Sequence, residues 1–286
     1  MRIVAAGREA AELVKFAHTA FALPFALIAA LAAAGGLPPW PAVGWILLAM
    51  AGARTAAMAF NRLADHALDA RNPRTAARAL PAGRLSRRFA WLLTAGGAAV
   101  FLLAAWRLNA LCLALAPLAL AWVLGYSYAK RLTPLSHLWL GLGLGIAPVG
   151  AWLAVRGSFA WPPLVLSAAV TAWVAGFDVL YSLQDEEFDR SSGLHSLPAR
   201  LGARRSLLVA RALHAVAALG FGVFALLVRG WGLWAGLAAA CVLLVWQHAL
   251  VGPGRLERLN TAFFAANGAL SILMLALYLL DIMVRA

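Results

Sequence analysis

Long apolar segments separated by short polar connections dominate this chain of 286 residues. A helix that crosses a bilayer needs roughly 17–25 residues of this kind. The pattern therefore predicts an all-α membrane protein, and we expect a single domain over residues 1–286. The nine segments that we expect to span the membrane are Phe16–Ala34, Trp40–Asn61, Phe89–Trp106, Leu108–Tyr128, Leu135–Val155, Trp161–Tyr181, Ser206–Val228, Trp231–Leu250 and Thr261–Val284.

The composition agrees with a membrane protein, since 64% of the residues are hydrophobic and only 12% are charged. A soluble domain carries about twice that share of charge. The first apolar run lacks the small-residue cleavage site of a secretory signal, and His18 and Thr19 interrupt its start. We therefore interpret it as a spanning helix. Cys112 and Cys241 lie inside apolar runs without metal-ligand spacing, which indicates inert thiols.

The basic residues are distributed unevenly between the two sides of the predicted membrane. Seventeen of the 24 fall on the side of the N-terminus and four on the opposite side. Cytoplasmic loops of membrane proteins carry such an excess of Lys and Arg. We therefore expect a multi-pass protein of the cell inner (plasma) membrane with a cytoplasmic N-terminus. The net charge of +13 then needs no nucleic-acid partner.

A first polar motif follows the second apolar segment. Asn61, Asp65 and Asp69 are spaced by four residues. On a helix they share one face, which drifts by roughly 40° per step. Three oxygen-bearing side chains on one face would form half of a site for a hard cation.

A second acidic stretch follows the sixth apolar segment, on the same side of the membrane. On a continuous helix, Asp178, Asp185 and Asp189 would lie within about 40° of one another, flanked by Tyr181. The two stretches hold seven of the eleven acidic residues. We expect this stretch to supply the second half of the site.

Two interpretations of these carboxylates compete. They solvate the helix ends and pair with nearby arginines, or they hold a metal ion. Like charges at i and i+4 destabilise a helix unless a cation lies between them, which favours the metal. Mg²⁺ binds few carboxylates together with substrate phosphates, and basic side chains bind the remaining phosphate oxygens. A charged site at the mouth of an apolar bundle suits an isoprenyl diphosphate.

These motifs resemble those of the UbiA superfamily of intramembrane aromatic prenyltransferases. Asn61, Asp65 and Asp69 match the family's N-x-x-x-D-x-x-x-D motif. The remaining matches are the D-x-x-Y-x-x-x-D-x-x-x-D motif at Asp178, Tyr181, Asp185 and Asp189, the N-P-R-T-A-x-R-x-L-P-x-G loop at 72–83, and the Tyr/Lys-Arg end of helix four at 126–131. Residues 15–25 and 193–200 look like the 4-hydroxybenzoate polyprenyltransferase-like branch, which includes the menaquinone prenyltransferase of the futalosine route.

The resemblance implies nine helices in one bundle around a central apolar cavity. It also implies Mg²⁺-dependent transfer of a polyprenyl group from polyprenyl diphosphate to the ring of 4-hydroxybenzoate or 1,4-dihydroxy-6-naphthoate, in ubiquinone or menaquinone biosynthesis. The implied metal ligands are Asn61, Asp65, Asp69, Asp178, Asp185 and Asp189. Asp65, Asp69, Asp185 and Asp189 would be catalytic, and the substrate would also meet Arg74, Arg78, Tyr126, Lys130 and Tyr181.

Arg54 lies about two turns deeper on the face of Asn61 and Asp65. It either binds the acceptor's carboxylate or pairs with a buried acid such as Asp65.

Three other functions compete with the main hypothesis. One is transfer to the acceptor of another UbiA branch. A CDP-alcohol phosphatidyltransferase is disfavoured because its D-G-x-x-A-R stretch is absent. A cation-coupled transporter is disfavoured, because it should carry its acids near the membrane midplane, whereas these acids lie at the ends of predicted spans.

Overall fold

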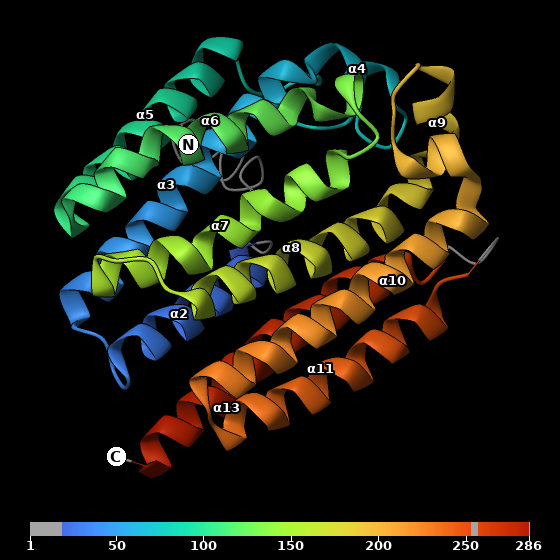
Figure 1. The fold of residues 1–286 in the computed structure, drawn as a ribbon. Coiled ribbons are helices and arrows are strands. Elements are labelled where there is room, and N and C mark those ends of the chain that lie inside the picture. Colours follow the sequence, from blue (N-terminus) through green and yellow to red (C-terminus); the bar gives the residue numbers. More distant parts are fainter. Residues whose placement is uncertain (1–18, 253–256, 286) are drawn as a thin grey trace. The chain divides into compact units, whose positions relative to one another are not determined.

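The computed structural model describes residues 19–252 and 257–285, except for the side chains of residues 19, 20 and 262. Within these ranges the chain is helical and contains no strand (Figure 1). The expected all-α class is confirmed. The elements are α2 (Thr19–Ala34), α3 (Trp40–Ala64), α4 (His66–Arg71), α5 (Arg87–Leu108), α6 (Ala110–Leu132), α7 (Ser136–Arg156), α8 (Trp161–Ser182), η2 (Leu183–Asp185), α9 (Glu186–Ser191), α10 (Leu197–Val228), α11 (Trp231–Leu250), α12 (Leu259–Thr261), η3 (Ala262–Ala266) and α13 (Asn267–Arg285).

Eight helical segments in the described ranges are long and apolar enough to cross a membrane. They correspond to the second to ninth predicted spans. The first span is helical from Thr19 to Ala34, and residues 16–18 lie outside the described residues. Helices α3, α8 and α11 begin at Trp40, Trp161 and Trp231, where the second, sixth and eighth predicted spans begin.

The predicted start of the seventh span at Ser206 is wrong, because α10 begins at Leu197. Ser196 caps this helix by accepting a hydrogen bond from the backbone N–H of Ala199. Such a serine stabilises a helix start, even though the following residues are polar. Gly202, with φ 73° and ψ 166°, then kinks the helix. Hydrophobicity alone therefore detects only the part beyond the kink.

The chain forms two compact units. The first contains residues 44–128, and the second contains residues 20–43 with residues from Ala129 onward. In the first unit, α3 and α5 approach closely at Gly52 and Gly97. A Cβ on Gly97 would lie 2.6 Å from the backbone nitrogen of Ala56, so glycine permits this contact.

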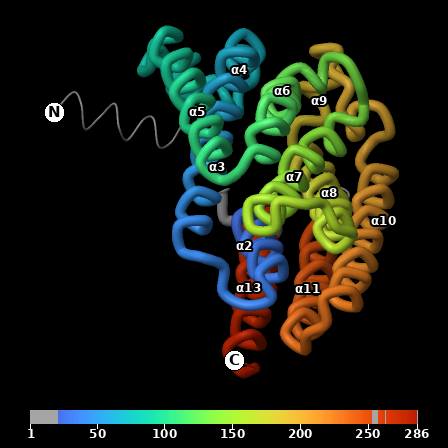
Figure 2. The backbone as a smooth tube through the Cα atoms, turned by 60° about the vertical axis from the view of Figure 1, so that its left-hand side comes forward, coloured from blue at the N-terminus to red at the C-terminus, as the bar shows by residue number. Residues whose placement is uncertain are grey.

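In the second unit, α8 lies between α7 and α10, and α11 packs against α13 (Figures 1 and 2). Helix α8 is the most buried of the spanning helices. A Cβ on Gly141 of α7 would overlap the carbonyl oxygen of Thr171, and one on Gly145 would lie 2.7 Å from that of Ser167. The glycine-rich run from Gly141 to Gly150 thus permits close packing of α7 on α8. It fixes α8, which carries Asp178, the first residue of the second acidic motif.

An aromatic cluster lies beside that motif. The rings of Phe21, Trp173, Phe177 and Phe263 meet edge to face, with centroids 5.1–6.4 Å apart. Asn267 supports the cluster by accepting a hydrogen bond from the Trp173 indole at 3.1 Å. Its amide also donates to the Phe263 carbonyl at 2.8 Å, inside the π-helical turn η3. The two hydrogen bonds of Asn267 therefore fix Trp173 and the backbone of Phe263 relative to each other.

Candidate functional site

The first acidic motif lies where α3 ends. Helix α3 stops at Ala64, and Asp65 adopts φ −93° and ψ 6° before α4 begins at His66. The backbone register continues across this break. The N–H of Asp65 donates to the Asn61 carbonyl at 2.9 Å, and the N–H of Asp69 donates to the Asp65 carbonyl at 2.7 Å. The four-residue spacing therefore keeps its helical register although the helix is interrupted.

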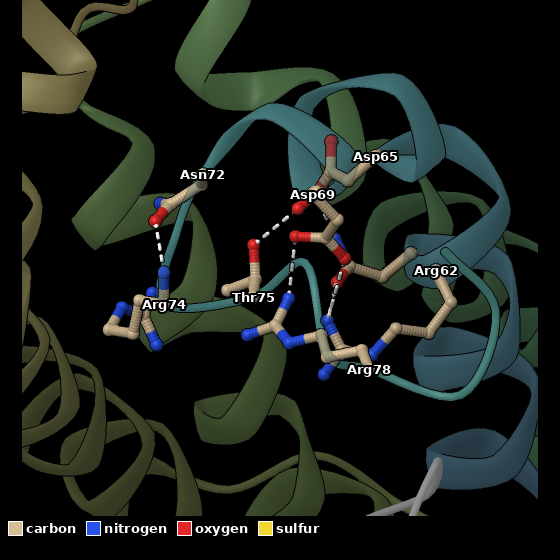
Figure 3. Close-up of polar contacts among 8 residues, drawn as sticks. Arg62, Asp65, Asp69, Asn72, Arg74, Thr75 and Arg78 are labelled. Atoms are coloured by element: carbon tan, nitrogen blue, oxygen red, sulfur yellow. Dashed lines mark hydrogen bonds and ion pairs between the residues drawn. The ribbon is translucent and has the colours of Figure 1, made fainter. Parts of the chain in front are cut away.

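The side chains of this motif contact one another and two arginines. The amide of Asn61 donates to Oδ2 of Asp65 at 2.9 Å. Arg78 donates to Oδ1 of Asp69 at 2.7 Å, and Arg62 lies 3.7 Å from Oδ2 of Asp69 (Figure 3). Asp69 is buried, whereas Asp65 is partly exposed. The deepest carboxylate of the motif thus lies between two guanidinium groups.

The loop that carries Arg78 is folded onto this motif. Asn72 accepts a hydrogen bond from the backbone N–H of Arg74 at 2.9 Å, which forms a local turn (Figure 3). The hydroxyl of Thr75 donates to the Asp69 carbonyl at 3.0 Å. Farther along, Leu80 packs into an apolar cluster with residues of α3. These contacts fix Arg78 near Asp69, while the side chain of Arg74 is exposed.

The second acidic motif changes helix type along its length. Asp178 belongs to α8, Asp185 ends the 3₁₀ turn η2, and Asp189 belongs to α9. The stretch is therefore not one continuous helix, which is the condition under which the sequence places the three carboxylates on a common face. A 3₁₀ turn has three residues per turn, so it rotates the following residues relative to an α-helix. Asp185 and Asp189 are buried, and Asp178 is partly exposed.

Lys130 is the basic partner of this second motif. Its Nζ lies 3.5 Å from Oδ2 of Asp189, and it is close enough to interact electrostatically with Asp178 and Asp185. The N–H of His195 donates to the Lys130 carbonyl at 2.8 Å, which ties the end of α6 to the loop before α10. The structure thus brings Lys130 together with all three predicted acidic ligands of the second motif.

The other predicted substrate residues are placed separately in the two units. In the first, Arg54 is half-buried on α3 and lies within electrostatic range of Tyr126. In the second, Tyr181 lies against Phe263, with ring centroids 4.3 Å apart. Tyr181, which follows Asp178 by three residues on α8, therefore extends the aromatic cluster towards the second acidic motif.

Two residues that contact the predicted carboxylates are absent from the predicted set. Arg62 precedes Asp69 by seven residues, so two helical turns place both on one face, and this spacing was available in the sequence. Nδ1 of His137 lies 2.6 Å from Oδ2 of Asp178, which is 41 positions farther along the chain. No local spacing predicts that contact, because it depends on how α7 packs against α8.

Both motifs have the chemistry to bind a divalent cation. Oδ2 of Asp69 and Oδ2 of Asp189 are buried carboxylate oxygens that receive no hydrogen bond. Such oxygens are costly to bury unless a charge compensates them. Among the described residues, no three His, Cys, Asp or Glu side chains converge into a metal cluster. Mg²⁺ needs only one or two carboxylates when phosphates complete its shell, so the residues fit this ion.

Known proteins resemble this chain in sequence. A model of the UbiA prenyltransferase family matches residues 22–275. A 4-hydroxybenzoate solanesyltransferase from Synechocystis sp. is 36% identical over 179 residues, which cover 60% of this chain and 59% of that relative. The chain thus matches less than two thirds of that protein. A 4-hydroxybenzoate octaprenyltransferase from Sodalis glossinidius is 31% identical over 238 residues, which cover 79% of each chain.

Solved structures show the same fold. The apo structure of a UbiA homolog from Aeropyrum pernix K1 is 37% identical, with a TM-score of 0.85 over 92% of this chain and 98% of that chain. A UbiA homolog from Archaeoglobus fulgidus, bound to DMAPP and Mg²⁺, has a TM-score of 0.75 over 96% of this chain and 99% of that chain. Its identity of 19% makes this a likeness of fold alone.

Proposed function

Because the chain belongs to the UbiA prenyltransferase family, we propose that it transfers a polyprenyl group from polyprenyl diphosphate to the ring of 4-hydroxybenzoate. The observation that carries the proposal is shared by the two motifs. In each, the last aspartate has one buried oxygen without a hydrogen bond and a basic group 3.5–3.7 Å from that oxygen. Carboxylates and cations placed in this way suit a metal-bound diphosphate.

Each motif would hold one Mg²⁺ ion. The ligands in the first motif would be Asn61, Asp65 and Asp69, and those in the second Asp178, Asp185 and Asp189. When bound, Mg²⁺ would supply positive charge that stabilises the departing diphosphate. Asp65, Asp69, Asp185 and Asp189 would act in catalysis by holding this ion.

The basic residues would bind the diphosphate directly. Arg78 and Lys130, which the structure places beside Asp69 and Asp189, would donate to phosphate oxygens as the substrate enters. Arg74 and Tyr126 would add further donors. Because the guanidinium of Arg78 is a planar fork, it can bind two phosphate oxygens at once.

The aromatic cluster would protect the reacting carbon. When the C–O bond of the donor breaks, diphosphate leaves with the bonding electrons and an allylic cation forms. The ring faces of Tyr181 and Phe263 would stabilise this cation, and the apolar surroundings would exclude water. The acceptor ring would then form the new C–C bond and give up its ring proton to a base. Arg54 would bind the acceptor's carboxylate.

We infer a site on the cytoplasmic side of the inner membrane, from the excess of basic residues on that side. Relatives named as 4-hydroxybenzoate enzymes favour that acceptor, and 1,4-dihydroxy-6-naphthoate is the alternative. One polyprenyl diphosphate should be supplied with each acid in turn and kcat/KM compared. We expect the higher value for 4-hydroxybenzoate. A higher value for the naphthoate would reassign the acceptor, and no transfer to either would contradict an aromatic acceptor of this class.

A further inference from the structure

His137 connects three helices of the second unit at one point. It is the second residue of α7, and only 1% of its side chain is exposed. Its Nδ1 lies 2.6 Å from Oδ2 of Asp178 on α8. The backbone N–H of Leu197, the first residue of α10, donates to its Nε2 at 3.3 Å. Both ring nitrogens are therefore engaged.

These two partners determine where the proton of His137 lies. The N–H of Leu197 only donates, so Nε2 must be the unprotonated nitrogen of the ring. In the neutral imidazole, Nδ1 then carries the proton and donates it to Asp178. The hydrogen bond from Leu197 also satisfies one of the N–H groups that a helix start leaves without an internal partner. The start of α10 thus fixes the orientation in which the imidazole meets Asp178.

We propose that His137 is a positioning residue that holds Asp178 in the orientation needed to bind the divalent cation. The inference rests on the proposed function, since it concerns the ion bound by the second motif. Asp178 is partly exposed, so its carboxylate would rotate among several orientations without a fixed donor. A hydrogen bond from a wholly buried ring removes that freedom before the ion arrives. Partners that orient metal ligands in this way typically contribute about 10–100-fold to metal affinity.

A matched pair of substitutions separates this role from simple packing. In His137→Asn, the amide nitrogen lies near the place of Nδ1, so the donor to Asp178 is kept and the acceptor for Leu197 is lost. In His137→Gln, the longer side chain places its amide near Nε2, so the contact with Leu197 is kept and the donor to Asp178 is lost. Each variant loses one of the two hydrogen bonds in the same buried place.

Electron paramagnetic resonance of free Mn²⁺, used in place of Mg²⁺, measures the affinity of each purified full-length protein for the ion. The melting temperature of each protein is measured as well. We expect His137→Gln to bind Mn²⁺ about 10–100-fold more weakly than the wild type, and His137→Asn to stay within about threefold of it. Equal affinities in the two variants, whether both unchanged or both reduced, would overturn the proposal.

Two further measurements keep the proposal testable. If the wild type binds no Mn²⁺, either alone or with inorganic diphosphate present, the metal site of the proposed function fails as well. If the wild type binds Mn²⁺, and if Asp178→Asn weakens this binding whereas His137→Gln does not, only the inference about His137 fails. Should either His137 variant not fold, ¹⁵N NMR of the histidine-labelled wild type tests the geometry. A neutral imidazole protonated at Nδ1 is expected, and its absence would overturn the proposal.

Discussion

Arg78 donates a hydrogen bond to Oδ1 of Asp69 at 2.7 Å, across nine residues of chain. Arg62 lies 3.7 Å from the other oxygen of the same carboxylate. The simpler interpretation of the motif, in which its acids pair with nearby arginines, is therefore correct for Asp69. It does not compete with metal binding, because Oδ2 receives no hydrogen bond. The arginines stabilise a buried charge that a cation and a diphosphate would otherwise compensate.

Replacing Arg78 should weaken binding of the prenyl donor. Hydrogen bonds to charged groups contribute about 1.5–3 kcal/mol, so Arg78→Gln should raise the KM for polyprenyl diphosphate by about 10–150-fold. Steady-state kinetics with saturating acceptor measure this change. Arg84→Gln is the control, because Arg84 is exposed in the same loop and should leave the KM close to that of the wild type. Equal effects of the two substitutions would show that only the net charge of the loop matters.

Lys130 should be needed for catalysis, while its neighbour Arg131 should not. Lys130 lies among the acids of the second motif, and Arg131 is exposed at the end of the same helix. Because a fixed donor at a developing negative charge contributes about 10²–10³-fold in rate, Lys130→Met should lower kcat by that factor. Arg131→Met should change kcat by much less. A Lys130→Met enzyme with normal kcat would exclude a role for this ammonium group in the transition state.

Arg54 should determine how well the acceptor binds. If its guanidinium binds the carboxylate, Arg54→Ala should raise the KM for 4-hydroxybenzoate by about tenfold or more and leave the donor KM unchanged. Arg54→Lys should give an intermediate KM, because it keeps the charge and loses the planar fork. An unchanged acceptor KM in Arg54→Ala would leave Arg54 with a structural role.

The close packing of α7 on α8 should make one glycine of the run far more sensitive than another. A Cβ on Gly141 would overlap the Thr171 carbonyl, whereas a Cβ on Gly150 would meet nothing within 4 Å. Forcing extra volume into a packed contact costs about 1–3 kcal/mol, so Gly141→Ala should lower the free energy of unfolding by about that amount. Gly150→Ala should be neutral or slightly stabilising. Thermal unfolding in detergent compares the two, and equal melting temperatures would contradict the packing.

The helices and the motifs were predictable because their signals are local. Runs of apolar residues indicate the spans, and the four-residue spacing of Asn61, Asp65 and Asp69 identifies a polar site. The resemblance to the UbiA family and the assignment as an enzyme of the prenyltransferase class are confirmed by the family match and by the named relatives. The single domain, the bundle around a central cavity and the individual site residues remain predictions.

What the sequence could not provide depends on tertiary structure. The 3₁₀ turn between Asp178 and Asp189 has no strong local signature, so the sequence did not indicate that the helix changes type within the motif. The contact between His137 and Asp178 exists only because α7 packs on α8 through Gly141 and Gly145. In contrast, the pairing of Arg62 with Asp69 was accessible, since a separation of seven residues places both on one helix face.

The most direct test of the account is Mg²⁺-dependent release of diphosphate from a polyprenyl diphosphate in the presence of 4-hydroxybenzoate. Asp65→Asn and Asp185→Asn each remove one predicted metal ligand, and Glu187→Gln is the control because Glu187 is exposed in the same acidic stretch as Asp185. We predict that both aspartate variants lose about 10²–10³-fold or more of the release rate, while Glu187→Gln keeps it. Full Mg²⁺-dependent release by both aspartate variants would contradict the assignment of Asp65 and Asp185 as metal ligands.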